Sequence, residues 1–291
     1  MTQPQQASPV PVSDPDARPG TRLPKPLGAL ICPPGDIFNA EAIRAQIADC
    51  AEHNGTAALR NEAVRLLRAA QKAGREAIAA GFAAEPFGAR RLTRSYTFLT
   101  DGLVTTAMHV ACDYLHPAGA PTEGERIAVM AVGGYGRGEM APSSDVDLLF
   151  LTPYKITAWA ESVIESMLYM LWDLRLKVGH SSRTIRDCLR LGAEDYTIRT
   201  AMLEHRYLAG HKPLAQELDD RLRNELFKGT SREFVEAKLA ERDARHLKQG
   251  ERYVVEPNVK EGKGGLRDMQ SLYWIAKYIY GVQDTGELVG L

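Results

Sequence analysis

The sequence has 291 residues, of which 44% are hydrophobic, so it is long enough to fill the core of one large domain or two ordinary ones. Its 36 Lys and Arg residues nearly balance its 37 Asp and Glu residues, so we expect neither a nucleic acid nor an anionic membrane as partner. The four cysteines form no CxxC pair, which predicts reduced thiols and no structural zinc site. No run approaches the roughly 18 consecutive apolar residues of a membrane helix, and we expect a cytoplasmic protein.

The N-terminal third of the chain predicts a tail followed by helices. Residues 1–37 are rich in Pro, Gln, Ser and Asp and lack the apolar core of a signal peptide, which indicates a disordered tail. Helical periodicity over residues 38–83, with one break, predicts two helices. A third amphipathic helix is expected over residues 87–115, where apolar residues recur at three- and four-residue steps.

Two short apolar runs, residues 126–132 and 146–151, predict neighbouring strands joined by a glycine-rich and acidic loop. An amphipathic helix is expected over residues 157–172 and a third strand over residues 174–180. We therefore expect a mixed α and β domain with its N-terminal helices over residues 38–192. The pattern after it is helical almost throughout and predicts a helical domain and linker over residues 193–291.

Asp145 and Asp147 flank a single valine at the start of the second predicted strand. Because side chains alternate between the two faces of a strand, both carboxylates point to the same side. Two such groups repel each other, and a divalent cation that prefers oxygen ligands removes the conflict. The pair is therefore predicted to be catalytic and to bind Mg²⁺.

Gly133 and Gly134 open the loop directly after the first strand, where the missing Cβ atoms permit close approach of a triphosphate to the backbone. Arg137 and Ser144 are predicted to add hydrogen bonds to the phosphate oxygens. Glu139 stands where a dinucleotide motif needs glycine and a Walker A loop needs lysine, so both of those phosphate sites are excluded. The combination predicts nucleotidyl transfer with release of pyrophosphate, whereas the structural alternative is a glycine turn in a hairpin that carries two exposed aspartates.

The run GGYGRGEMAPSSDVDLLFL at residues 133–151 resembles the GG…DxD signature of the polymerase β-like nucleotidyltransferase superfamily. More narrowly, the chain resembles the bifunctional uridylyltransferase/uridylyl-removing enzymes that modify signal protein PII. Further similar segments are FGARRL at residues 87–92, LWD at 171–173, VGHS at 178–181 and PNVKEGKGGLRD at 257–268. Together they extend the resemblance over roughly residues 38–291.

The resemblance implies an α+β fold of the polymerase β type and transfer of UMP from UTP to a tyrosine of PII, in nitrogen (glutamine) sensing. Members of this family continue into a metal-dependent HD domain, which removes uridylyl groups, and two glutamine-sensing ACT domains. Neither is present in these 291 residues. We therefore expect the chain to hold the transferase half, with a linker towards the missing HD domain.

The superfamily's third carboxylate normally lies on a neighbouring strand. Asp173 is our candidate, because it precedes the third predicted strand, and Asp187 and Glu165 are fallbacks. The alternative is that Asp173 only flanks the end of a helix.

Three other functions stay open from the sequence. One is nucleotidyl transfer to another acceptor, such as adenylyl transfer to glutamine synthetase or to a small molecule, because nothing in residues 133–147 selects uracil over adenine. Another is a catalytically silent nucleotide-binding module, against which both retained aspartates argue. The third is a template-independent RNA polymerase, which the near-neutral charge disfavours. Only residues 257–268 favour the PII-modifying enzyme.

Overall fold

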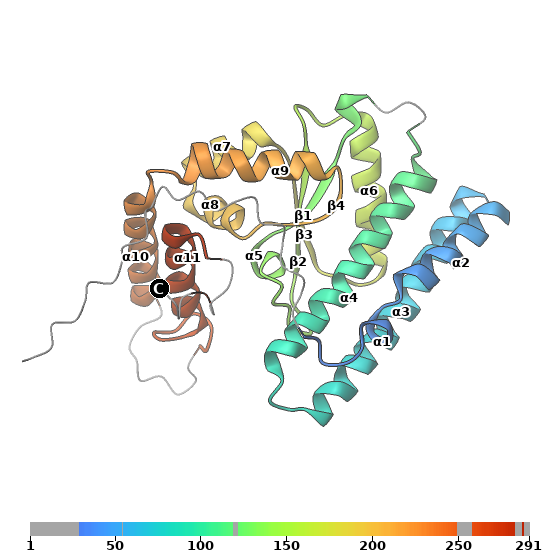
Figure 1. Cartoon of the computed structure of the whole chain (residues 1–291), viewed down its shortest axis with the longest axis horizontal. Helices are drawn as coiled ribbons and strands as arrows, with labels where there is room; N and C mark the ends of the chain where they lie inside the picture. The colour runs from blue at the N-terminus through green and yellow to red at the C-terminus, as the bar shows by residue number, and fades with distance from the viewer. Residues whose placement is uncertain (1–28, 54, 119–121, 249–257, 283–286, 288–291) are drawn as a thin grey trace, which may run out of the picture. The chain divides into compact units, whose positions relative to one another are not determined.

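A computed structural model describes residues 29–53, 55–118, 122–248, 258–282 and 287 (Figure 1). Contacts between residues divide the chain into two compact units, of which one spans Pro24–Thr230 and the other includes Ser231–Leu291. Residues 1–28 of the predicted tail lie outside the described residues. No helix in the described ranges is both long and apolar enough to cross a membrane.

The described end of the predicted tail is ordered, so the prediction is wrong for residues 29–37. This segment contains α1 (Pro34–Ile37), and both Ile31 and Ile37 are buried in the core of the larger unit. The Ile31 backbone N–H donates a hydrogen bond of 2.9 Å to Ser95 Oγ. Burial of these two apolar side chains holds the segment against the core. The sequence did not indicate this, because the prolines around them are typical of a disordered tail.

Several more helical segments follow α1 before the sheet begins. They are α2 (Ala40–His53), α3 (Thr56–Ala84), α4 (Ala89–His109) and the π-helical turn η1 (Val110–Leu115), followed by the short η2 (Glu123–Glu125). Helices α3 and α4 form a long antiparallel hairpin, and α2 lies along α3 (Figure 1). The three helices predicted before the first strand are confirmed.

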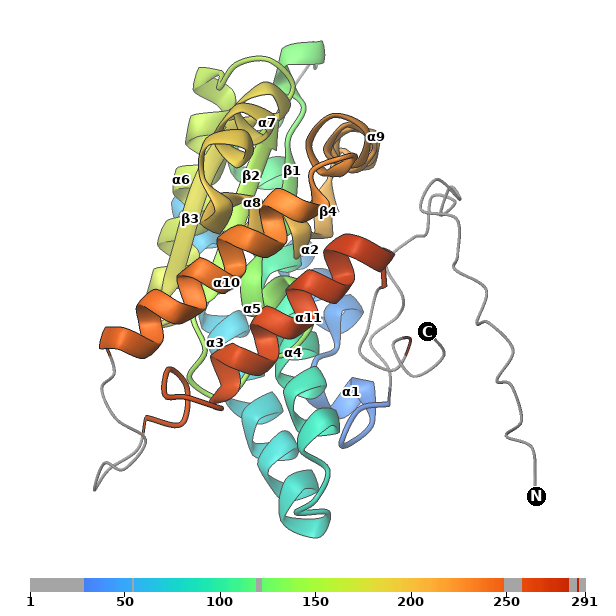
Figure 2. The same cartoon turned by 90° about the vertical axis from the view of Figure 1, so that its left-hand side faces the viewer.

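A mixed four-stranded sheet lies at the centre of this unit. Its strands are β1 (Ala128–Ala131), β2 (Val146–Thr152), β3 (Val178–Thr184) and β4 (Arg206–Gly210), in the spatial order β3-β2-β1-β4 (Figure 2). Strand β1 pairs antiparallel with β2 and β4, whereas β2 and β3 are parallel. Helix α6 (Ala158–Asp173) makes the crossover that parallel strands require. The predicted α+β class with a small mixed sheet is confirmed.

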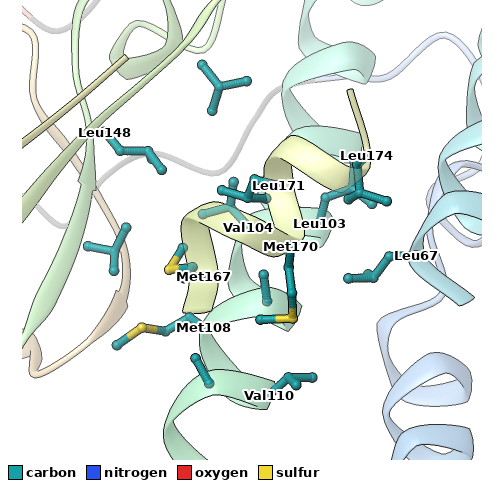
Figure 3. Close-up of a cluster of buried hydrophobic side chains, with 14 of the residues drawn as sticks. Leu67, Leu103, Val104, Met108, Val110, Leu148, Met167, Met170, Leu171 and Leu174 are labelled. Atoms are coloured by element: carbon teal, nitrogen blue, oxygen red, sulfur yellow. The ribbon is translucent and has the colours of Figure 1, made fainter. Parts of the chain in front are cut away.

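Helices cover both faces of the sheet. On one face, Leu148 and Phe150 of β2 pack with α3, α4 and α6 in a core of leucine, valine and methionine side chains (Figure 3). On the other face, Leu149 and Leu151 pack with α7 (Ile185–Glu194), α8 (Tyr196–Leu203), α9 (Lys212–Arg221) and η3 (Leu222–Phe227). Asp147 alternates with these two leucines, so its carboxylate belongs to the second face.

Strand β4 lies inside the segment that was predicted to be helical from residue 193 onwards. It has only five residues, too few to interrupt the helical pattern of α8 and α9 visibly. It joins the sheet because it pairs with β1, and Leu208 and Ala209 pack against the first core. The contacts therefore divide the chain after Thr230, whereas the sequence predicted a boundary after residue 192.

The smaller unit contains α10 (Ser231–Lys248) and α11 (Leu266–Tyr280), which pack against each other. Phe234 stacks on Tyr278 with ring centroids 4.0 Å apart, and the buried Lys238 ammonium lies over the Trp274 ring. The carboxylate of Asp268 connects the turn before α11 to α10 through hydrogen bonds. It accepts hydrogen bonds from the Gly264 N–H at 2.7 Å and from His246 at 2.9 Å, and it also pairs with Arg245.

Candidate active site

The glycine loop begins where β1 ends and forms the single helical turn α5 (Gly133–Gly136). Gly133 has a φ of 60°, a left-handed conformation that glycine adopts without steric cost. The N–H of Val132 donates a hydrogen bond of 3.0 Å to the carbonyl of Asp147, so the start of the loop is fixed directly to β2. The two motifs predicted from the sequence are thus one local structure.

Asp145 is exposed immediately before β2, and Asp147 is half-buried as the second residue of the strand. Val146 between them is buried in the core, as the alternation of side chains requires. Burial raises the pKa of Asp147, and the neighbouring charge of Asp145 raises it further. The structure therefore brings the two predicted carboxylates together and leaves their repulsion to be relieved by a counter-charge.

Asp147 is bordered by a glycine on each side. A Cβ atom built on Gly133 would lie 3.6 Å from Oδ2 of Asp147, so the glycine loop borders one carboxylate oxygen. A Cβ atom built on Gly179 of β3 would lie only 2.5 Å from Oδ1, the other oxygen. Gly179 is also the register partner of Asp147 in the parallel pair of strands. The carboxylate thus occupies space that any other residue at position 179 would take.

Arg137 lies against the glycine loop and is 11% exposed. Its Nη1 donates a hydrogen bond of 2.6 Å to the buried carboxylate of Glu204, and its Nε donates one of 3.1 Å to Glu139. A Cβ atom on Gly134 would lie 3.5 Å from the remaining nitrogen, Nη2. Two nitrogens of the guanidinium are therefore hydrogen-bonded to carboxylates, and the third lies beside the predicted nucleotide-binding glycines.

A second ion pair, between Arg206 and Asp101, contacts the glycine loop. It was not predicted from the sequence. Arg206 at the start of β4 donates two hydrogen bonds, of 2.8 and 3.0 Å, to the carboxylate of Asp101 on α4. Arg206 also donates a hydrogen bond of 3.3 Å to the carbonyl of Tyr135, and its guanidinium lies 5.4 Å from the centre of the Tyr135 ring. Both partners are mostly buried, so the pair holds the glycine loop between α4 and β4.

Ser144 lies in the exposed turn before the aspartates. Its Oγ accepts a hydrogen bond of 2.9 Å from the N–H of Ala141, and its own N–H donates one of 3.1 Å to the Ala141 carbonyl. Arg75 of α3 donates a hydrogen bond of 2.6 Å to the Pro142 carbonyl in the same turn. These contacts shape the approach to Asp145, and the predicted contact of Ser144 with phosphate stays a prediction.

The predicted third carboxylate has a different partner. Asp173 is the last residue of α6, where it forms an ion pair of 2.6 Å with Arg60 and its carbonyl accepts a hydrogen bond from Arg68, both on α3. Asp187 caps α7 through Thr184, and Glu165 is exposed on α6. Among the described residues, no group of three His, Cys, Asp or Glu side chains is placed to hold a metal ion.

Strand β3 begins at Val178, later than predicted, and this explains the position of Asp173. The residue of β3 that lies opposite Asp147 is Gly179, so the neighbouring strand contributes no carboxylate there. A catalytic role for Asp173 stays a prediction, and its ion pair with Arg60 speaks against it.

Comparison with known proteins shows that the chain is similar to nucleotidyltransferases. A family model for glutamate-ammonia ligase adenylyltransferase matches residues 22–177, more than half of the chain, and a model for GlnD PII-uridylyltransferase matches residues 233–291. A bifunctional uridylyltransferase/uridylyl-removing enzyme of Ruegeria pomeroyi is 72% identical over 256 residues, which cover 88% of this chain and 28% of that protein. The chain belongs to the nucleotidyltransferase family that the first of these models describes, and over most of its length it is similar to bifunctional uridylyltransferase/uridylyl-removing enzymes.

Two further relatives carry the same name as the Ruegeria pomeroyi enzyme. The enzyme of Cereibacter sphaeroides is 63% identical over 264 residues, covering 89% of this chain and 28% of its own length. The enzyme of Azospirillum brasilense is 52% identical over 241 residues, covering 82% of this chain and 26% of its own length. The chain therefore spans about a quarter of the length of these relatives.

Nucleotidyltransferases as a family use a divalent metal ion, and the residues of this chain fit one. Asp145, directly before β2, and Asp147, within it, supply neighbouring carboxylate oxygens, which are the ligand type that hard divalent cations prefer. Burial and the neighbouring charge of Asp145 raise the pKa of Asp147, so its charged form is disfavoured without a cation nearby. A bound cation would supply the missing counter-charge.

Proposed function

We propose that this chain transfers the UMP group of UTP to a tyrosine hydroxyl of signal protein PII. The hydroxyl oxygen forms a bond to the α-phosphorus, the bond from that phosphorus to the bridging oxygen breaks, and pyrophosphate leaves. The phenolic proton passes to water. The observation that carries the reaction type is the glycine loop hydrogen-bonded to the strand that contains Asp147 and begins directly after Asp145. The names of the relatives and of the second family model support UTP and PII.

Each part of the site has a role in this reaction. Gly133 and Gly134 let the triphosphate approach the backbone of α5, where N–H groups of a helix start favour negative charge. Nη2 of Arg137 adds a cation on the same side. Asp145 and Asp147 would hold Mg²⁺, which would supply positive charge next to the phosphates. Arg206 and Asp101 keep the loop in position during transfer.

Purified PII incubated with the chain, Mg²⁺ and UTP labelled at the α-phosphate tests the proposal. We expect label on PII that disappears when Asp145 or Asp147 is changed to Asn, because either change removes a charged metal ligand. Asp49→Asn is the matched control, since the Asp49 side chain is 81% exposed on α2. Chelation of the metal should stop the transfer and added Mg²⁺ should restore it. Normal transfer by either active-site variant would show that the carboxylate assignment is wrong.

Adenylyl transfer is the second candidate, because the glutamate-ammonia ligase adenylyltransferase model matches the part of the chain that contains the glycine loop and both aspartates. Offering α-labelled ATP in place of UTP, with PII or glutamine synthetase as acceptor, separates the two. Labelling from UTP alone supports the first candidate. Labelling of glutamine synthetase from ATP would replace it by the second.

A further inference from the structure

Strand β3 forms an edge of the sheet beside the carboxylates. One of its sides pairs with β2, and no strand among the described residues pairs with the other (Figure 2). An unpaired edge offers backbone donors and acceptors to which an extended segment of another protein can bind. Gly179 and His180, near the start of this edge, are exposed.

An exposed aromatic cluster adjoins this edge, formed by Tyr169 and Trp172 of α6 and His180 of β3. The Tyr169 and Trp172 side chains are 49% and 44% exposed. The Tyr169 and Trp172 rings are 5.5 Å apart and the Trp172 and His180 rings 6.4 Å apart, all edge to face. Large aromatic side chains held rigidly at a surface are typical anchors of protein interfaces.

The cluster and the carboxylates lie on opposite faces of β3. His180 is the register partner of Leu148, which belongs to the core beneath α6, whereas Gly179 is the partner of Asp147 on the other face. Successive side chains of an added strand would likewise point to opposite faces. One residue of such a strand would contact the aromatic cluster while its neighbour pointed towards the carboxylates.

The two glycines that border Asp147 lie beside different oxygens of its carboxylate, so each substrate can be assigned to one oxygen. The glycine loop borders the Oδ2 side, to which the proposed function assigns the triphosphate, so the Oδ1 side beside Gly179 is left for the acceptor. Because strands lie about 4.8 Å apart, a segment added to β3 is about 10 Å from the backbone of β2. A side chain that passes over Gly179 towards Asp147 must therefore cover much of that distance, and tyrosine is among the longer side chains.

We propose that the β3 edge and the aromatic cluster form the docking surface for the extended, tyrosine-bearing segment of the protein acceptor. The segment adds to β3 as a further strand, places its tyrosine over Gly179, and packs an adjacent side chain on Trp172 and His180. This inference rests on the proposed function, because it assigns the acceptor's place at the same site.

Steady-state labelling of PII by the full chain tests the docking surface. In Trp172→Ala and His180→Ala we expect the KM for PII to rise by about tenfold or more, because an interface anchor is lost. We expect the KM for UTP and kcat at saturating PII to stay within about twofold, because neither residue borders the glycine loop. Phe87→Ala is the matched control, since Phe87 is an entirely exposed aromatic side chain elsewhere in the same unit.

The outcomes separate the two levels of the proposal. If the unsubstituted chain labels PII and both variants retain its KM, the docking surface is wrong and the function stands. If the unsubstituted chain does not label PII, both are overturned. A rise in the KM for UTP equal to that for PII would show a general disturbance and also overturn the docking surface. Should Trp172→Ala fail to fold, His180→Ala and Tyr169→Ala decide the matter by the same measurement.

Discussion

Substitution of Gly179 by alanine should impair catalysis without removing any functional group. The new Cβ atom would lie 2.5 Å from Oδ1 of Asp147, whereas ordinary contact begins at 3.4 Å, so one of the two must move by about 0.9 Å, the difference between these distances. Gly179 is paired with β2 at this position, which limits movement of its backbone. The carboxylate therefore moves instead. A misplacement of about 1 Å at a reacting group lowers the rate on the order of 100-fold.

The assay is the rate of UMP transfer to PII at saturating substrates over a range of Mg²⁺ concentrations, with a thermal melt of each protein. We expect kcat to fall by roughly two orders of magnitude and the Mg²⁺ requirement to rise, because the displaced carboxylate is a proposed metal ligand. Gly35→Ala is the control, since nothing lies within 4 Å of a Cβ atom built there. An unchanged kcat with unchanged Mg²⁺ dependence would refute the proposed position of Asp147 in the reaction.

Three further predictions concern stability. Arg206→Lys should lower the free energy of unfolding by about 1–3 kcal/mol in urea, because Lys cannot make both hydrogen bonds to Asp101. Arg137→Gln should cost about 3 kcal/mol or more, because it leaves the Glu204 carboxylate buried without its cation, and adding Glu204→Gln should recover part of that loss. Burial alone would raise the pKa of Asp268, but hydrogen bonds from Gly264, Arg245 and His246 hold it below its ordinary value of 3.8. That stabilisation is present above pH 3.8 and is lost as pH falls through the folded pKa, so Asp268→Asn should be destabilising at pH 7 and neutral in acid, as thermal melts across pH would show.

The glycine loop and the aspartate pair could be predicted because their geometry is local. Alternation along an extended segment predicts Asp145 and Asp147 on the same side without reference to any distant residue, and in the structure the charge of Asp145 reaches Asp147. Strands β1 and β2 could be predicted because each is a short continuous run of apolar residues, which is also a local feature. The tail was predicted too long because composition averages over a window, whereas Ile31 and Ile37 act as individual anchors.

The supports of the loop could not be predicted because they join distant parts of the chain. Arg206 and Asp101 are 105 residues apart, and Arg137 and Glu204 are 67 apart. Nothing in a single sequence marks such pairs before the sheet order is known. Strand β4 was missed on the same ground, since its pairing with β1 rather than its own five residues makes it a strand.

The position of Asp173 shows how a small error in a strand boundary changes a chemical assignment. Had β3 begun where predicted, an acid near its start would have lain beside Asp147; because β3 begins at Val178, the adjacent residue is Gly179. A glycine on each side of Asp147 leaves both of its oxygens open to groups that the protein does not supply. Among the described residues, β3 therefore places no acid opposite Asp147, and Gly179 leaves room there for an incoming hydroxyl, so we expect catalysis to depend on positioning both substrates around Asp145 and Asp147.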